Sequence, residues 1–325
     1  MAFPASVRKA PAAPKKLSGV ETTETKTAIS LRSGSVRAVF DKSTGLLTEF
    51  GAGVNLIQRG PQLNVWRAAI DNDCMKLFLT KREKWFTAKK PLPNWLNFKL
   101  NEVKHSVASV RLIRSKDALP IVEIVHQVSG REQWKDFQHI HRYTLTPAGE
   151  LHVENTVKIG PDLNDLPRIG VSLILTPGLE QLEWFGRGPW ENYPDRKASA
   201  MLGRYKSTVA EQYVPYVMPQ ENGHKTDTRW LTLTGADGHG LQVHGEPVLE
   251  FSASHFTDND LYAAFHTCEL KPRPEVTLNL DTVVRGLGTA ACGPDTLEQY
   301  KIQGKEYKFD YRLILQRKVA AGQAE

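Results

Sequence analysis

Short runs of alternating apolar and polar residues, each closed by glycine, proline, aspartate or asparagine, repeat along most of this chain. The stretch AISLRSGSVRAVFDKSTGLLTEF, residues 28–50, contains several such runs, and KSTG at residues 42–45 has the composition of a turn. Alternation places successive side chains on opposite faces of a strand. The pattern therefore predicts a β-hairpin in this part of the chain.

The same alternation returns in five further segments, and helix candidates between them are few and short. These segments are PIVEIVHQVSG (120–130), HIHRYTLTPAGELHVENTVKIG (139–160), RIGVSLILTP (168–177), RWLTLTGADGHGLQVHG (229–245) and EVTLNLDTVVRGLG (275–288). Strands spaced in this way, without intervening helical periods, favour an antiparallel sandwich. We therefore expect an all-β fold, in which 24 glycines and 19 prolines mark the turns.

Three stretches break the pattern. Residues 1–25 are rich in Ala, Pro, Lys and Thr without apolar periodicity, which predicts a flexible, linker-like lead. Residues 67–95 lack alternation and are long for a connection; such loops tend to be functional or mobile. The segment WFGRGPWENYPDRK, residues 184–197, is expected to interrupt the strands on either side of it.

Composition narrows the class of protein. With 40% apolar and 24% charged residues, the 325-residue chain can bury a substantial core. A net charge of +6 without a recognisable basic module argues against nucleic-acid binding. Three widely spaced cysteines suggest neither a zinc knuckle nor a disulfide framework. Without a signal peptide or a run of about 20 apolar residues, we expect a cytoplasmic protein that does not enter membranes.

Glycoside hydrolysis needs two carboxyl groups about 5–9.5 Å apart across the scissile bond. Glu191, Asp195 and Glu221 are the local candidates, because they lie among tryptophans, tyrosines and glycines. The alternative is structural, since a dipeptide such as Asp195–Arg196 commonly forms an ion pair. We favour the structural interpretation.

Metal binding has one candidate pair. His139 and His141 alternate, so on a strand both point to the same face, where Glu154 or Asp136 could join them. No further ligand with metal-site spacing appears. Two polar residues on a solvent-facing strand face are therefore the preferred interpretation.

Three turns rich in glycine, aromatic and amide residues remain: GRGPWENYPDR, YVPYVMPQENGHKTDTRW and RGLGTAACGPDTL. Tryptophan and tyrosine stack on the apolar face of a pyranose, while Asn, Gln and Glu bind its hydroxyls. The same residues equally well brace a corner of a sandwich. Composition alone leaves both interpretations open.

These turns also carry a family resemblance. GRGPWENYPDRKASAMLGRY, YVPYVMPQENGHKTDTRWLTL and LNLDTVVRGLGTAACGPDTL, with WRAAIDND upstream, resemble the C-terminal domain of glycoside hydrolase family 2 β-galactosidases. In some bacteria that domain is a separate small subunit. The resemblance implies a large antiparallel super-sandwich, similar to galactose mutarotases, over residues 26–318. Residues 1–25 and 319–325 would then be a flexible lead and tail.

The resemblance implies a function shared with another domain or chain. The family's catalytic glutamates belong to a TIM barrel, and nothing here has the pattern of eight βα units. This chain would complete the active site of a retaining β-galactosidase and would not hydrolyse galactosides alone. Its expected partners are the barrel domain or large subunit and galactosides, within an oligomer. The resemblance implies magnesium and sodium in the complete enzyme, but no metal, cofactor or catalytic residue in this chain.

The resemblance also assigns site residues. The loop GLGTAACGPD is expected at the edge of the active site, with Cys292 where some relatives carry a substrate-binding tryptophan. The segment after DND is expected to be a mobile loop, and Met75 stands where many relatives have glycine, which implies a stiffer hinge. The edge residues are Cys292, Gly293 and Asp295; the loop residues are Asp71, Asn72, Asp73, Cys74 and Met75; the structural signature comprises Trp190, Glu191, Asn192, Tyr193, Asp195, Arg196, Glu221 and Asn222.

Two alternative functions stay open at this stage. Trp190 and Tyr193, together with the linker-like lead, would suit a free-standing carbohydrate-binding module. A mutarotase-like enzyme would need a general acid and a general base on either side of the anomeric carbon. The second alternative rests on shared architecture, which does not establish function.

Overall fold

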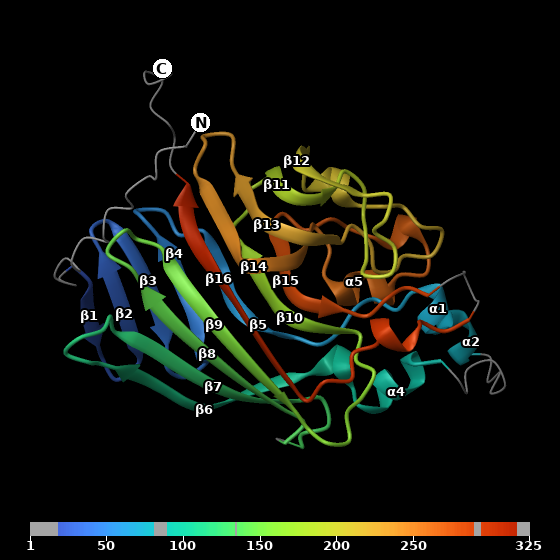
Figure 1. The fold of residues 1–325 in the computed structure, drawn as a ribbon, viewed down its shortest axis with the longest axis horizontal. Helices are drawn as coiled ribbons and strands as arrows, with labels where there is room; N and C mark the ends of the chain where they lie inside the picture. The colour runs from blue at the N-terminus through green and yellow to red at the C-terminus, as the bar shows by residue number, and fades with distance from the viewer. Residues whose placement is uncertain (1–18, 81–89, 134, 289–293, 317–325) are drawn as a thin grey trace, which may run out of the picture.

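The computed structural model describes residues 19–80, 90–133, 135–288 and 294–316, and its strands form two antiparallel sheets (Figure 1). The smaller sheet has the order β1-β2-β3-β4. Its strands are β1 (Glu21–Glu24), β2 (Ala28–Ser33), β3 (Val36–Asp41) and β4 (Leu46–Gly51).

The larger sheet contains twelve strands in the described part of the chain. Its main path runs β12-β11-β13-β14-β16-β9-β8-β7-β6, and β15, β10 and β5 branch in that order from the long strand β14. The strands are β5 (Ile57–Asn64), β6 (Lys104–Ile113), β7 (Ile121–Ser129), β8 (Phe137–Leu145), β9 (Leu151–Ile159), β10 (Arg168–Leu175), β11 (Gln181–Gly188), β12 (Met201–Thr208), β13 (Lys225–Thr234), β14 (Gly240–Ser254), β15 (Val276–Val284) and β16 (Glu306–Gln316). The all-β, antiparallel prediction is confirmed.

The predicted hairpin residues form β2, β3 and β4, and the turn KSTG joins the last two. The Asp41 carboxylate accepts the backbone N–H groups of Ser43 and Thr44, which fixes this turn. Gly45 has a φ of +64°, and an added Cβ would lie 2.6 Å from Nε2 of His126. Glycine is therefore required where the turn approaches β7.

The main hydrophobic core lies between the two sheets. Leu31, Phe40 and Phe50 of the smaller sheet contribute to the same buried cluster as Val153 and Phe251 of the larger sheet. On β9, buried residues alternate with less buried ones, as the sequence pattern predicts for a sheet with one face in the core. Burial of these side chains is the main force that holds the sheets together.

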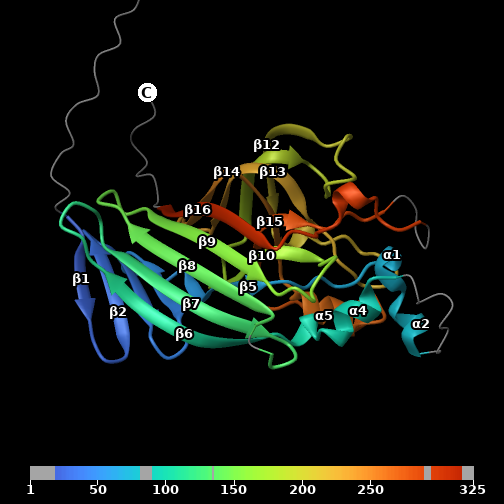
Figure 2. The same cartoon turned by 60° about the horizontal axis from the view of Figure 1, so that its bottom comes forward.

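The helices gather at the end of the molecule opposite the smaller sheet, as Figures 1 and 2 show for α1, α2, α4 and α5. A second hydrophobic cluster underlies them, with the Trp66 and Trp95 rings in edge contact. No helix among the described residues is long and apolar enough to span a membrane. The helical elements are α1 (Asp71–Cys74), α2 (Lys76–Thr80), α4 (Leu92–Asn97), α5 (Asp258–Ala263) and the 3-10 turns Leu100–Glu102, Ala210–Gln212, Thr267–Glu269 and Glu298–Tyr300.

Two predicted boundaries change. Strand β1 lies inside residues 1–25, where a flexible lead was expected; it is a mostly exposed strand paired to β2 and therefore has no apolar alternation. Residues 184–188 complete strand β11 instead of interrupting it, and the corner begins at Pro189. The expected tail, residues 319–325, lies outside the described residues.

Candidate functional site

Four segments that are far apart in the sequence meet at the helical end of the larger sheet. They contribute to a pocket of about 250 Å³. Its lining comprises Ile70, Asp71, Asn72, Tyr193, Arg196, Tyr216, Gln220, Glu221, Leu287 and Gly288. All four segments belong to the motifs that carry the family resemblance, so the fold brings those motifs to one place. We call it the motif pocket.

The first segment contains the DND motif at α1. The Asp73 carboxylate accepts the backbone N–H of Ile70 at 3.1 Å and so caps the first turn of the helix. It also accepts both ends of the Arg67 guanidinium, at 3.0 and 2.7 Å. Both side chains are fully buried. A buried charge needs a paired partner with several hydrogen bonds, and this bidentate pair meets that requirement.

The DND segment also contains the predicted mobile loop. The backbone N–H of Asp71 donates to Oε1 of Gln220 at 3.3 Å, and burial raises the pKa of the Asp71 carboxyl. Met75 has an ordinary φ of −60°, whereas Cys74 has a φ of 140°, which is unusual for a residue with a side chain. The unusual backbone conformation therefore lies one residue before Met75. Mobility of the loop stays a prediction.

Asp195 of the second segment fastens the loop at residues 286–288. Its carboxylate accepts the backbone N–H of Leu287 at 2.9 Å and that of Gly288 at 2.8 Å. From the other side, the Asn72 amide donates to the carbonyl oxygen of Leu287 at 2.7 Å. Gly288 has a φ of +88°, which glycine adopts without strain. Three motifs thus position one short backbone segment.

The predicted ion pair between Asp195 and Arg196 is wrong. Arg196 donates to Glu191 at 2.5 Å, because the Asp195 carboxylate is turned toward the loop backbone. Glu191 also accepts the backbone N–H of Gly223 at 2.9 Å and the hydroxyl of Tyr216. The corner is therefore held by Glu191.

Other signature residues brace the same corner. Asn192 accepts the backbone N–H and the hydroxyl of Thr226, at 2.9 and 2.6 Å. Tyr193 is buried and stacks on His224, with ring centroids 5.2 Å apart. Trp190 is 58% exposed. Of the two aromatic residues considered as a sugar platform, only Trp190 is available at the surface.

Glu221 of the third segment is buried against Arg168, which donates to it at 3.0 Å. Burial raises the pKa of Glu221, and the positive charge of Arg168 acts in the opposite direction. The same guanidinium lies 3.1 Å from Asp258 and 3.2 Å from Asp281. Asn222 is a turn residue: its side-chain amide oxygen, Oδ1, accepts the backbone N–H of Val214 at 3.0 Å.

Asp295 of the fourth segment supports the base of the predicted edge loop. Arg285 donates to it at 2.7 Å, and Lys301 lies 3.0 Å from its other oxygen. Partial burial would raise the pKa of Asp295, but these bonds lower it overall. Arg285 also binds both oxygens of Asp165, at 2.6 and 3.0 Å. Cys292 and Gly293 lie outside the described residues.

The chemistry of the motif pocket follows from these pairings. Glu191, Asp195 and Glu221 each accept several donors or a buried guanidinium, so the geometry favours their structural interpretation. Asp71 and Glu221 both line the pocket, but Glu221 is paired with the buried guanidinium of Arg168. The pocket can instead present backbone and amide groups to a molecule at its rim.

Sequence reasoning missed the three buried arginines that organise the site. Arg67 and Arg285 lie inside the quoted motifs, and Arg168 begins the segment RIGVSLILTP. The sequence signal that could have identified such an arginine is its position within an apolar segment, beside an Asp-rich motif. Their partners are distant in sequence, so spacing could not identify them.

The histidine pair is not on a solvent-facing surface, so that interpretation is wrong. His139 and His141 are buried, with ring centroids 3.5 Å apart, and His126 is adjacent. They lie on the core side of β8, because every second residue from Phe137 to Leu145 is buried. Asp136 binds Arg131 and Ser129 instead, and Glu154 is exposed. Among the described residues, no three His, Cys, Asp or Glu side chains are grouped to hold a metal ion.

Two stacked antiparallel sheets, with four motifs meeting at one end, define an all-β domain of the super-sandwich class. The model of the beta-galactosidase small chain family matches residues 32–313. The chain therefore belongs to the beta-galactosidase small chain family.

Curated relatives agree with that assignment. The beta-galactosidase of Kluyveromyces lactis is 27% identical over 295 residues, which cover 89% of this chain and 27% of that protein. The beta-galactosidase of Vibrio cholerae is 31% identical over 255 residues, which cover 77% of this chain and 23% of that protein. The chain thus spans about a quarter of the length of the curated relatives it matches.

Among solved structures, a GalM/aldose epimerase homologue from C. elegans aligns over 91% of this chain and 98% of its own, with 11% identity and a TM-score of 0.44. A putative aldose 1-epimerase from Escherichia coli aligns over 91% of this chain and 99% of its own, with 11% identity and a TM-score of 0.42.

Proposed function

We propose that this domain completes the active site of a retaining β-galactosidase whose catalytic glutamates lie on another domain or chain. The observation that carries the proposal is the convergence of the four family motifs on the motif pocket. The limited share of each relative that the chain matches is consistent with a part of a larger enzyme.

The role of the domain would be to position a loop. Asp195 holds Gly288 and Arg285 holds Asp295, so these two residues fix both described ends of the segment that contains Cys292 and Gly293. Rigid support from neighbouring side chains is what a substrate-contacting loop requires for a defined geometry. We assign the magnesium and sodium of the complete enzyme to the other part of it.

A chimera tests the proposal. In the Vibrio cholerae beta-galactosidase, the segment that matches this chain would be deleted, and separately replaced by residues 32–313. We expect the deletion to abolish hydrolysis of o-nitrophenyl β-galactoside and the replacement to restore it. The isolated 325-residue chain should show no hydrolysis.

Asp195→Ala in the chimera should lower kcat/KM about tenfold or more, because loss of two backbone acceptors releases residues 287 and 288. Asp162→Ala, at an exposed position, is the matched control and should leave activity unchanged. Hydrolysis by the isolated chain, or a folded chimera without activity, would overturn the proposal.

A further inference from the structure

The side chain of Lys76 ends among four backbone oxygen atoms. Its ammonium lies 3.3 Å from the carbonyl oxygen of Pro219, 3.2 Å from that of Leu261 and 2.7 Å from that of Tyr262, and it also contacts that of Ala264. Three of these carbonyl groups belong to the end of α5, and the fourth directly precedes the third segment of the motif pocket. We call the four groups the carbonyl cage.

The carbonyl cage is suited to a positive charge. The ring centroids of Tyr262 and Phe265 lie 5.5 and 5.2 Å from the Lys76 nitrogen, and aromatic faces at such distances attract a cation. Burial lowers the pKa of Lys76 to about 8, with the charge of Glu269 opposing, so the side chain is still mainly charged at pH 7. The cage therefore compensates a buried charge with carbonyl dipoles and ring faces.

The cage offers more acceptors than a lysine can use. The Lys76 ammonium has three protons, so it cannot donate a linear bond to each of four oxygens. A spherical cation has no such limit and can contact all four at once, as potassium does between the carbonyl groups of a channel filter. Potassium and ammonium ions are nearly equal in size. A cage that accommodates an ammonium group therefore has the dimensions for a potassium ion.

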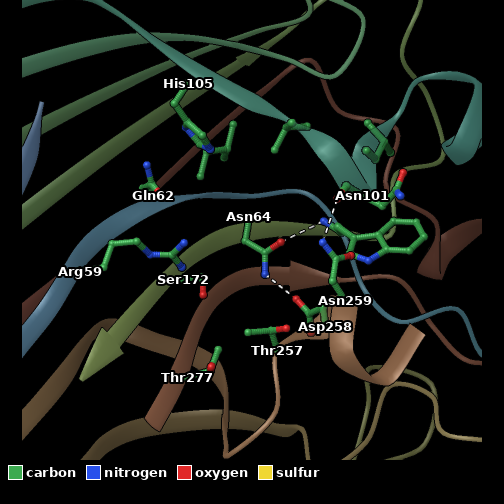
Figure 3. Close-up of a pocket in the computed structure, with 14 residues that line it drawn as sticks. Arg59, Gln62, Asn64, Asn101, His105, Ser172, Thr257, Asp258, Asn259 and Thr277 are labelled. Carbon is green, nitrogen blue, oxygen red and sulfur yellow. Dashed lines mark hydrogen bonds between the residues drawn. The ribbon is translucent and has the colours of Figure 1, made fainter. Parts of the chain in front are cut away.

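The α5 side of the cage is held in place without Lys76. The helix begins with a capping box, in which the hydroxyl of Thr257 accepts the backbone N–H of Asp260 at 3.1 Å. Its first residue, Asp258, accepts the Asn64 amide at 3.0 Å inside the pocket drawn in Figure 3. These bonds fix the start of a short helix. Its last carbonyl groups should therefore stay gathered when the lysine side chain is removed.

The Pro219 side of the cage is also fixed by its own neighbours. The backbone N–H of Glu221 donates to the carbonyl oxygen of Ala68 at 2.9 Å, and Oε1 of Gln220 accepts the backbone N–H of Asp71 at 3.3 Å. Both sides are thus anchored by bonds that do not involve the ammonium. The cage is a preformed site, and Lys76 is its occupant.

We propose that the carbonyl cage is a site for one monovalent cation of potassium size, which this chain fills with its own Lys76 ammonium. Lys76 is then a tethered cation that joins the DND segment to α5 and to the segment after Pro219. The cation arrives with the folding chain, so the native protein needs no free ion at this place. The proposal does not depend on the proposed function, because it concerns how three segments are held together.

Two substitutions separate the charge of Lys76 from its volume. Lys76→Ala empties the cage, whereas Lys76→Met keeps an apolar side chain of similar length in it. Amide hydrogen exchange of residues 71–80 in the full 325-residue chain would be measured in KCl, NaCl and choline chloride at equal ionic strength. In choline chloride, exchange in Lys76→Ala should be about tenfold faster or more than in the wild type.

Potassium should reverse the effect of Lys76→Ala. An ion that binds only the closed state slows exchange in proportion to its occupancy, so about 150 mM KCl should slow it about tenfold if the dissociation constant is about 15 mM. Sodium should protect less, because a smaller ion cannot contact all four oxygens unless the cage contracts. Exchange in the wild type and in Lys76→Met should not depend on the salt. Lys308→Ala, at an exposed position on β16, is the matched control and should behave as the wild type.

Three results would overturn the proposal. The first is equal exchange of Lys76→Ala in KCl and choline chloride, and the second is an equal response of Lys76→Met, which would place the ion elsewhere. The third is stronger protection by sodium than by potassium, which would contradict the size match. If Lys76→Ala is unfolded in choline chloride, refolding in KCl supports the proposal, and failure to refold in any salt while Lys76→Met is folded overturns it.

Discussion

Individual charged residues around the motif pocket act mainly by orienting the backbone. Arg67 donates to the carbonyl oxygen of Arg285 at 2.5 Å, and Asp195 accepts two amides of the adjacent loop. Charge-assisted bonds of this kind are roughly twice as strong as neutral ones. A small set of charged side chains therefore fixes loops that would otherwise have few contacts with the sheet.

Glu250 gives the protein a distinctive pH dependence. Burial raises the pKa of Glu250 from 4.5 to about 8, with the charge of Lys197 opposing. Because the folded state holds its proton more tightly than the unfolded state, Glu250 lowers the free energy of unfolding as pH rises from about 4.5 to about 8. Glu250→Gln keeps an acceptor but cannot ionise. We expect its stability relative to the wild type to increase by up to about 1.4 kcal/mol per pH unit in that window.

Urea unfolding at pH 5, 6, 7 and 8 measures this difference. Glu306→Gln, at an exposed position, is the control and should follow the wild type at every pH. A Glu250→Gln profile parallel to that of the wild type would show that Glu250 does not retain a proton in this range.

Among the elements, α2 is held by one lysine. The Lys76 ammonium lies within hydrogen-bond distance of four carbonyl oxygens, including those of Leu261 and Tyr262 in α5 and of Ala264 just after it. The last carbonyls of a helix lack partners within the helix, so a cation at this end satisfies them. Lys76 thereby ties the DND segment to α5.

Lys76→Met should release this connection. Because bonds to a charged donor contribute about 1.5–3 kcal/mol each, we expect amide hydrogen exchange in residues 71–80 to accelerate at least tenfold. Lys308→Met, at an exposed position on β16, should have no such effect. Exchange in the wild type also tests the predicted mobile loop: protection equal to that of the flanking strands would contradict its mobility.

Alternation predicted the strands well wherever one face is buried. The segments at 120–130, 139–160 and 168–177 became β7 to β10 because their inward side chains have period two. Strand β1 was not predicted, since its residues are mostly exposed and its order depends on pairing with β2. The short helices at 71–80 were not predicted, because side-chain pairs such as Arg67–Asp73 and distant carbonyls stabilise them.

The motif pocket was only partly predictable. Its segments could be identified from the motifs, but the partners of Asp195 lie about ninety residues away, at Leu287 and Gly288. A local Asp–Arg pair was therefore the natural but incorrect expectation. A second pocket, whose lining includes Arg59, Ser172 and Thr277, left no sequence signal, since these residues come together only through strand register.

For the whole molecule, the motif pocket and the second pocket lined by Arg59, Ser172 and Thr277 are two separate openings. Arg168 connects them: it donates to Glu221, which lines the motif pocket, and to Asp258, which lines the second pocket. Its guanidinium is fully buried. Arg168 is therefore one of the buried cations that connect the helical end to the sheet.

Arg168→Met should destabilise the whole domain. Removing one partner from a buried ion pair typically costs 3–5 kcal/mol, because the remaining carboxylates stay buried without compensation. We expect a clear fall in the urea midpoint with an unchanged slope. Arg312→Met is the control, since Arg312 makes partly exposed pairs with Glu150 and Glu246 that contribute about 1 kcal/mol or less. A loss for Arg168→Met no larger than for Arg312→Met would contradict this account.

The position of Arg168 also limits how the two openings can be redesigned. A substitution at Glu221 alters the charge balance that Asp258 experiences, and the reverse holds as well, because both carboxylates share one guanidinium. Libraries that reshape either opening should keep this trio fixed and vary the neutral residues around it.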